Sequence, residues 1–144
     1  MTNPNNEEGR FGYHDNSYIA AGSFDGIAKL VDDFYDHMER HDFSKKIFKM
    51  HPKDIKESRR KLTYFLSGWL GGPKLYSKNY GGISIPGVHQ HLAIGPEERD
   101  AWLECMRLAI DDQPYTPEFS VYLLTQLSVP ANRVEVVCQR RTLR

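Results

Sequence analysis

The sequence has little cysteine, no excess of charge and no long apolar segment. Only Cys105 and Cys138 occur among its 144 residues, and two cysteines are too few for a disulfide scaffold, so we expect reduced thiols in a cytoplasmic protein. Lys and Arg together number 19, as do Asp and Glu, which leaves no net charge to attract nucleic acid. No apolar run approaches the ~20 residues that span a bilayer. The composition therefore predicts neither a nucleic acid nor a membrane as a partner.

The N-terminal region lacks a basic stretch followed by an apolar one. Residues 1–17 are mostly polar, so we expect no secretory signal there and interpret the stretch as a flexible extension. No repeat, low-complexity tract or linker divides the chain that follows. Its length fits one domain, which we expect to comprise residues 18–144.

Apolar residues recur at spacings of three and four in four long stretches, which predict amphipathic helices. These stretches run from Ile27 to Met38, from Ile55 to Leu70, from Trp102 to Ile110 and from Phe119 to Val134. A fifth, shorter segment surrounds Ile47. We expect Pro52 to end it and to occupy the first turn of the next helix. Few segments alternate cleanly between apolar and polar residues, so we predict an all-α fold, with residues 134–136 as the main local ambiguity.

Glycine and proline mark where these helices should end. The Gly-Gly-Pro sequence at 71–73 stops the second long stretch, whose charged residues, including Arg59, are expected on the opposite, solvent-facing side. Six glycines and prolines interrupt residues 74–96, where we expect an ordered loop with only a short helical turn near residues 88–92. Pro130 lies inside the last stretch and should kink or divide that helix.

The histidines are the main candidate ligands. His37 and His41 are four residues apart and could bind a metal from one helix face, but their charged neighbours favour a solvated face. His89 and His91 could belong to a zinc site, could be one loop and one core histidine, or could supply a single imidazole above an apolar cavity. Taken alone, the second of these readings is favoured. We find no glycine-rich phosphate loop, nucleophile elbow or Cys–His pair with a third member.

Tyr35 and Trp102 add polar groups to otherwise apolar helix faces. Such residues are most often core side chains whose polar tip is satisfied by a hydrogen bond. Beside an apolar helix and a loop histidine, they can instead line a pocket for a polar diatomic ligand.

Four segments, in order, resemble the group II truncated haemoglobins. They are Leu-Val-Asp-Asp-Phe-Tyr-Asp at 30–36, Met-His-Pro-Lys-Asp-Ile at 50–55, Phe-Leu-Ser-Gly-Trp-Leu-Gly-Gly-Pro-Lys-Leu-Tyr at 65–76 and Glu-Arg-Asp-Ala-Trp-Leu-Glu-Cys-Met at 98–106. The resemblance covers residues 18–136. It implies a truncated globin-like two-over-two helical sandwich with a shortened F helix and an ordered loop before it.

The resemblance also implies haem b as the cofactor, with His89 as the protein ligand to the iron. It places Tyr35, Trp102 and His51 on the distal side as possible hydrogen-bond donors to a bound ligand. We further expect His51 to coordinate the iron when no other ligand is present. The arginines that the family commonly has beside its proximal histidine are absent here, and His91 replaces a proline.

Further haem contacts are implied by position. Ser58 and Leu62 match the E-helix positions nearest the distal ligand, whereas Phe65 and Leu66 match residues that pack on the haem. Lys74 and Tyr76 match the positions whose side chains reach a haem propionate.

The function implied by the resemblance is binding of O₂, and also of CO, NO or sulfide, at a His-ligated iron. Several donors would slow ligand release, which suits redox or NO/peroxide chemistry better than bulk oxygen transport. A second hypothesis is an NO dioxygenase or a peroxidase-like enzyme, which would need an external reductase. A third is a globin-fold sensing or interaction module with weak or no haem binding. We expect a monomer or a homodimer.

Overall fold

The computed structural model describes residues 10–82, 89 and 92–142, and this part of the chain contains helices and no strands. His89 also has helical geometry. The helices, in chain order, are α1 (Asn16–Ala20), α2 (Ser23–Arg40), the 3₁₀ helix η1 (Asp42–Ser44), α3 (Lys45–Lys49), α4 (Ile55–Trp69), α5 (Leu75–Tyr80), α7 (Pro96–Asp111) and α8 (Pro117–Thr142). The all-α prediction is confirmed.

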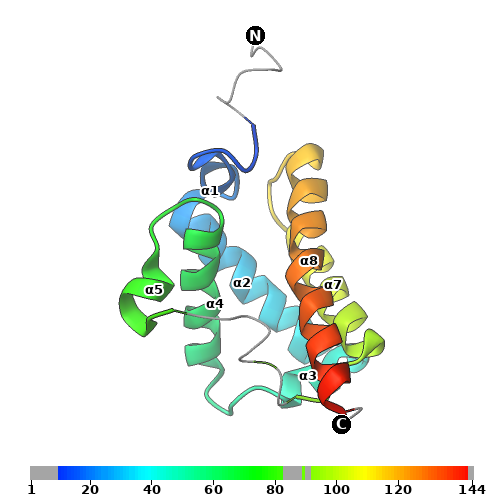
Figure 1. Ribbon diagram of the computed structural model, residues 1–144. Helices are drawn as coiled ribbons and strands as arrows, with labels where there is room; N and C mark the ends of the chain where they lie inside the picture. Colours follow the sequence, from blue (N-terminus) through cyan, green and yellow to red (C-terminus); the bar gives the residue numbers. More distant parts are fainter. Residues whose placement is uncertain (1–9, 83–88, 90–91, 143–144) are drawn as a thin grey trace.

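Two pairs of long helices form the body of the fold. α2 packs against both α4 and α7, and α7 packs against α8 (Figure 1). The pair α2/α4 therefore lies over the pair α7/α8, which is the predicted two-over-two arrangement. The fully buried side chains at its centre come from all four helices: Ile27, Leu30, Val31, Phe34 and Met38, then Leu66, Cys105, Met106, Ala109 and Leu123. Their spacing of three and four residues along each helix explains why the apolar pattern predicted these elements.

Side-chain caps begin two of these helices. Asp54 is the N-cap of α4, where its carboxylate accepts a hydrogen bond from the Lys56 backbone N–H at 3.3 Å. The prediction that Pro52 occupies the first turn of this helix is therefore wrong, because α4 begins three residues later. At the start of α7, the Glu98 carboxylate accepts a hydrogen bond from the Gly95 N–H at 2.9 Å.

Gly71 and Gly72 form the turn after α4, and the N-terminal segment packs closely against them. Gly71 has a φ of 95°, and a Cβ there would lie 2.1 Å from the His14 carbonyl oxygen, whereas a Cβ on Gly72 would lie 2.3 Å from the Tyr18 ring. In the same region the Tyr18 N–H donates to the Leu70 carbonyl at 3.0 Å, and the Phe11 ring packs on the core. Part of the expected extension at 1–17 thus contacts the folded domain.

Two expectations about helix boundaries are wrong. Residues 75–80 form α5 where a loop was expected, and α8 continues through Pro130 as one element. Proline removes one backbone hydrogen bond, but Leu127 and Val134 are buried on either side of it, so packing offsets that loss. The ambiguous residues 134–136 are helical.

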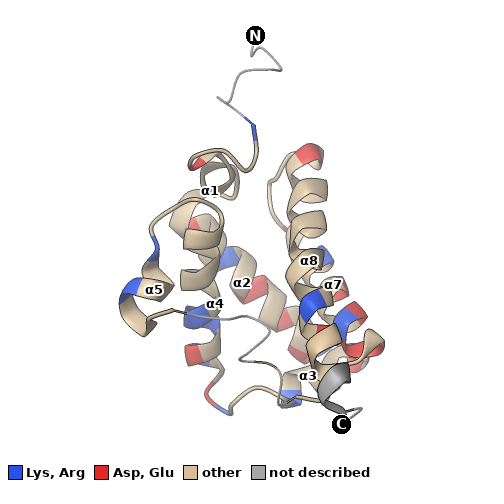
Figure 2. Cartoon of the chain, viewed as in Figure 1, with Lys and Arg blue, Asp and Glu red and all other residues tan. Residues whose placement is uncertain are grey.

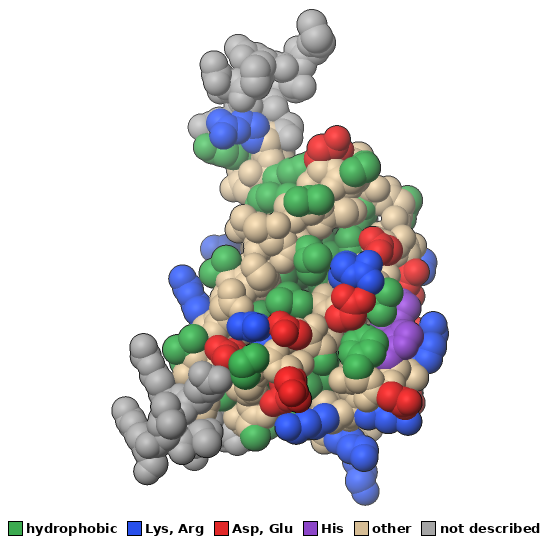
Figure 3. All heavy atoms as spheres, turned by 90° about the vertical axis from the view of Figure 1, so that its right-hand side faces the viewer, with side chains coloured by type: hydrophobic (Ala, Val, Ile, Leu, Met, Phe, Trp, Pro, Cys, Tyr) green, Lys and Arg blue, Asp and Glu red, His purple; other side chains and the backbone are tan. Residues whose placement is uncertain are grey.

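The surface shows no strong separation of charge. Figure 2 shows Lys and Arg mixed with Asp and Glu along the helices, and on the face drawn in Figure 3 hydrophobic side chains interrupt the charged ones. None of the helices within the described residues has both the length and the apolar character needed to cross a bilayer.

Candidate functional site

Tyr35 on α2 and Trp102 on α7 lie on either side of Phe34. The Phe34 ring is 5.1 Å from the Tyr35 ring and 5.1 Å from the Trp102 ring, both edge-on. Tyr35 is only 4% exposed, and burial raises the pKa of its hydroxyl far above the usual value. Among the described residues, none accepts a hydrogen bond from the Tyr35 hydroxyl or the Trp102 indole N–H. Neither donor is therefore used within the described part of the chain.

His51, between α3 and α4, lies next to Tyr35. The two rings are 5.4 Å apart and nearly perpendicular. The Nδ1 atom of His51 is 2.9 Å from the Ile47 carbonyl oxygen, and because a carbonyl only accepts, Nδ1 must bear the proton. Burial lowers the pKa of His51 and favours the neutral ring. The remaining nitrogen, Nε2, then offers a lone pair rather than the donor expected from the sequence.

The α4 residues predicted to line the site share one side of the helix but differ in burial. Ser58, Leu62 and Phe65 follow one another at spacings of four and three and are half-buried. Leu66 is fully buried in the protein core, where it contributes to the packing of the helices. The first three residues therefore form a mostly apolar wall along one side of α4.

His89 is placed by contacts of its backbone. Its carbonyl oxygen accepts a hydrogen bond from the Leu92 N–H at 2.9 Å and from the thiol of Cys138 at 3.1 Å. Cys138 is on α8 and is 1% exposed, so the second bond joins the short helical turn to the core. A charge on His89 would also act to lower the pKa of His51, less than burial does. His91, the competing ligand, lies outside the described residues.

α5 places Tyr76 beside the wall formed by α4. The Tyr76 ring is 6.4 Å from the Phe65 ring and 5.0 Å from the Tyr80 ring. The Tyr80 hydroxyl donates to the Glu57 carboxylate at 2.9 Å, which ties α5 to the start of α4. Lys74, just before α5, is exposed. Tyr76 is therefore near the predicted haem-packing residue Phe65. Among the described residues, the Lys74 side chain forms no hydrogen bond or ion pair with another predicted site residue.

The histidine pair at the end of α2, His37 and the C-cap His41, has a structural partner. His37 Nε2 is 2.6 Å from the Asp112 carboxylate, His37 Nδ1 is 3.3 Å from His41 Nε2, and the two rings are stacked. Only 12% of the His37 side chain is exposed, so the expectation of a solvated face is wrong for this residue. Within the described residues no group of His, Cys, Asp or Glu is arranged to bind a metal.

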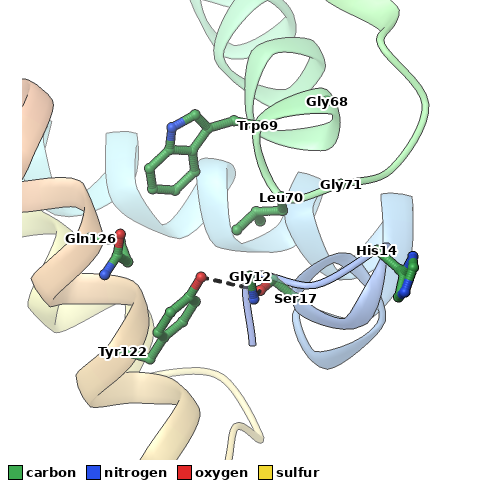
Figure 4. Close-up of a pocket in the computed structure, with 9 residues that line it drawn as sticks. All are labelled: Gly12, His14, Ser17, Gly68, Trp69, Leu70, Gly71, Tyr122 and Gln126. Atoms are coloured by element: carbon green, nitrogen blue, oxygen red, sulfur yellow. Dashed lines mark hydrogen bonds between the residues drawn. The ribbon is translucent and has the colours of Figure 1, made fainter. Parts of the chain in front are cut away.

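A separate crevice of about 340 Å³ lies at the other end of α4. Figure 4 shows Trp69 of α4 across from Tyr122 and Gln126 of α8, with the N-terminal segment closing one side. There the Gly12 N–H donates to the Ser17 hydroxyl at 2.9 Å, and this hydroxyl donates to the Tyr122 oxygen at 3.5 Å. None of the predicted site residues lines this crevice, so we do not assign it to the iron.

The sequence did not single out two residues next to the site. Arg59, expected in solvent, lies over the Tyr35 ring and pairs with two carboxylates of α2. Cys138 contacts His89 from 49 residues away in the chain. Helical periodicity indicates which side of a helix is buried but not which residue of a distant element it meets, so neither contact had a signal in the sequence.

Known proteins share both this sequence pattern and this geometry. The family model described as "Bacterial-like globin" matches residues 16–131. The group 2 truncated hemoglobin YjbI of Bacillus subtilis is 35% identical over 108 residues, which cover 75% of this chain and 80% of that protein. A cold-adapted truncated hemoglobin from Pseudoalteromonas haloplanktis is 29% identical, with a TM-score of 0.79 over 82% of this chain and 95% of that chain.

Two further solved structures are similar. The group II truncated hemoglobin of Bacillus anthracis is 30% identical, with a TM-score of 0.76 and coverage of 82% of this chain and 88% of that one. The truncated oxygen-avid haemoglobin from Bacillus subtilis is 33% identical, with a TM-score of 0.74 and coverage of 82% and 97%. The chain therefore belongs to the bacterial-like globin family, among the group II truncated haemoglobins, whose cofactor is haem b.

Proposed function

We propose that this globin binds haem b through His89 and uses its distal donors to bind O₂ and other diatomic ligands tightly. The observation that supports this is the unbroken series of ring contacts from Trp102 through Phe34 and Tyr35 to His51. Bound haem supplies an iron that takes up a diatomic ligand. The side chains around it are suited to that group, because they combine one imidazole, an apolar wall and two available donors.

His89 would provide the protein ligand to the iron, which requires a neutral imidazole with an unprotonated nitrogen. Its backbone is tied to α8 through Cys138, and this tie would limit how far the ring moves. Leu62 and Phe65 would pack on the haem, whereas Leu66, which the sequence also placed there, is fully buried in the core between the helices. Lys74 and Tyr76 would reach a propionate, and the missing arginines beside His89 predict that propionate anchoring is weaker here than is common in the family.

Tyr35 and Trp102 would donate hydrogen bonds to a ligand with partial negative charge. Each such bond contributes about 0.5–1.5 kcal/mol net, and both groups are in an environment of low dielectric constant, where polar interactions strengthen. The two donors together favour slow ligand release. Slow release suits redox or NO/peroxide chemistry, with electrons from an external reductase, better than bulk oxygen transport.

His51 would act as an acceptor or as a second iron ligand rather than as a donor. Its Nδ1–H is used by the Ile47 carbonyl, so Nε2 is the atom that can coordinate. We expect resonance Raman spectra of the ligand-free protein to show six-coordinate iron in the parent and five-coordinate iron in His51→Ala. Five-coordinate markers in both proteins would exclude this coordination.

The decisive experiment is a haemin titration of the purified apoprotein, followed by absorption spectra after reduction and after addition of CO. We expect stoichiometric uptake and a Soret band, and we expect His89→Gly to lose most of the band while added imidazole restores it. His91→Ala is the matched variant and should retain the parent spectrum. Loss of the Soret band in His91→Ala instead of His89→Gly would overturn the ligand assignment, and failure of the parent to bind haemin would favour the sensing or interaction module.

A further inference from the structure

Arg59 on α4 lies against the distal tyrosine from outside the pocket. Its guanidinium carbon is 5.6 Å from the centre of the Tyr35 ring, within the range of a cation–π contact. The same guanidinium donates to the carboxylates of Asp32 at 3.2 Å and Asp36 at 2.9 Å, and to the Asp32 backbone carbonyl at 3.0 Å. Four contacts with α2 therefore fix this charge beside Tyr35.

The positive charge in this cluster is more deeply buried than the negative charges are. The Arg59 side chain is 21% exposed, whereas those of Asp32 and Asp36 are 61% and 50% exposed. Water screens exposed charges much more strongly than partly buried ones. Although two carboxylates surround one guanidinium, the field at the Tyr35 ring is therefore dominated by Arg59.

We propose that Arg59 sets the strength of the Tyr35 hydrogen bond to a distal ligand through its charge, and so helps to determine ligand specificity. This inference rests on the proposed haem function. A cation over the ring withdraws electron density from the phenol, which makes its O–H a better donor to a polar ligand such as O₂ than to a weakly polar one such as CO. In agreement, the charge of Arg59 acts to lower the pKa of Tyr35, against the larger rise caused by burial.

The C–O stretching frequency of the ferrous CO complex is a direct readout of the field in the distal pocket, because positive potential near the oxygen lowers that frequency. We expect Arg59→Gln to raise the frequency and to speed O₂ release about two- to threefold, less than loss of the Tyr35 bond itself. Arg59→Lys retains the charge but loses the planar fork that pairs with two carboxylates, and should stay near the parent frequency. Asp36→Asn removes a negative charge while Arg59 remains, and should shift the frequency in the opposite direction.

Arg60→Gln is the matched control, because Arg60 is the next residue on α4, is 55% exposed and pairs with Glu57 instead. It removes the same charge and should leave the frequency unchanged. If Arg59 acts only by joining α2 to α4, Arg59→Lys and Arg59→Gln will shift the frequency equally, and the inference is wrong. A protein that binds no haem would refute the proposed function instead, whereas normal CO binding with an unchanged frequency in Arg59→Gln would refute only the role of Arg59.

Discussion

The two sides of the proposed iron site are built in different ways. The two distal donors, Tyr35 and Trp102, come from long helices, and the Phe34 ring that contacts both of them is fully buried. On the proximal side, His89 has helical geometry within a short turn, and its carbonyl accepts two hydrogen bonds. Packing of the long helices thus positions the two distal donors, whereas the carbonyl of the proposed proximal ligand is bonded to the distant helix α8.

From this difference we expect the cofactor to help organise the proximal side of the site more than the distal side. A side chain gains order when it binds a metal, so metal binding and local ordering are linked. We expect haem to add little to the stability of α2, α4 and α7 and more to that of the turn around His89. Three substitutions test the comparison, in decreasing order of expected effect.

Leu66→Ala should weaken the framework of the distal side. Leu66 is fully buried between the helices, and truncation of such a leucine typically lowers the free energy of unfolding by about 2–5 kcal/mol, because it leaves a cavity. Urea denaturation of the apoprotein measures this change. Leu62→Ala, at a half-buried position of the same helix, should cost clearly less, and equal losses would show that the distal framework is not pre-formed in the apoprotein.

Tyr35→Phe should remove a distal donor while the wall stays intact. Loss of one hydrogen bond of ordinary net strength speeds O₂ release about two- to twelvefold, which stopped-flow mixing of the ferrous O₂ complex can measure. Tyr115→Phe is the control, because this buried hydroxyl donates to the Ala21 carbonyl at 3.2 Å instead and should leave the release rate unaltered. An unchanged rate in Tyr35→Phe would mean that its hydroxyl does not reach the ligand.

Cys138→Ala should loosen the proximal side by a smaller amount. A thiol is a weak donor, and loss of such a bond of about 0.5–1 kcal/mol corresponds to a two- to fivefold faster loss of haem to an acceptor protein. Cys138→Ser retains a donor and should restore most of the parent rate. Cys105→Ala removes an equally buried thiol, and the same acceleration in that variant would point to general destabilisation rather than to the contact with His89.

The sequence predicted the long helices well, because their stability comes from a continuous buried stripe. It missed α5, which has only six residues and whose position depends on contacts of Tyr76 with Phe65 and of Tyr80 with Glu57. Short helices are marginal by themselves, so tertiary contacts decide whether they form. The expected break at Pro130 was wrong for the same reason, because buried residues on both sides keep α8 together.

The sequence could predict which residues belong to the candidate site, but not the contacts between them. Tyr35, Trp102 and His51 were found through the family resemblance, and the structure brings Tyr35 next to His51 and, through Phe34, to Trp102. The tautomer of His51 could not be predicted, because it is set by the carbonyl of Ile47 at 2.9 Å. Arg59 was interpreted as a solvated charge, since periodicity does not reveal that α2 presents two carboxylates opposite it.

Although α8 is one element, Pro130 is a weak point within it. Because proline has no N–H, the helix lacks the bond to the Gln126 carbonyl, so its two halves are joined by one hydrogen bond fewer than in a helix without proline. The half that contains Tyr122 lies against the N-terminal segment, and the half that contains Cys138 lies against His89. In amide hydrogen-exchange experiments the two halves should therefore open as separate cooperative units, and release of haem should accelerate exchange mainly in the second.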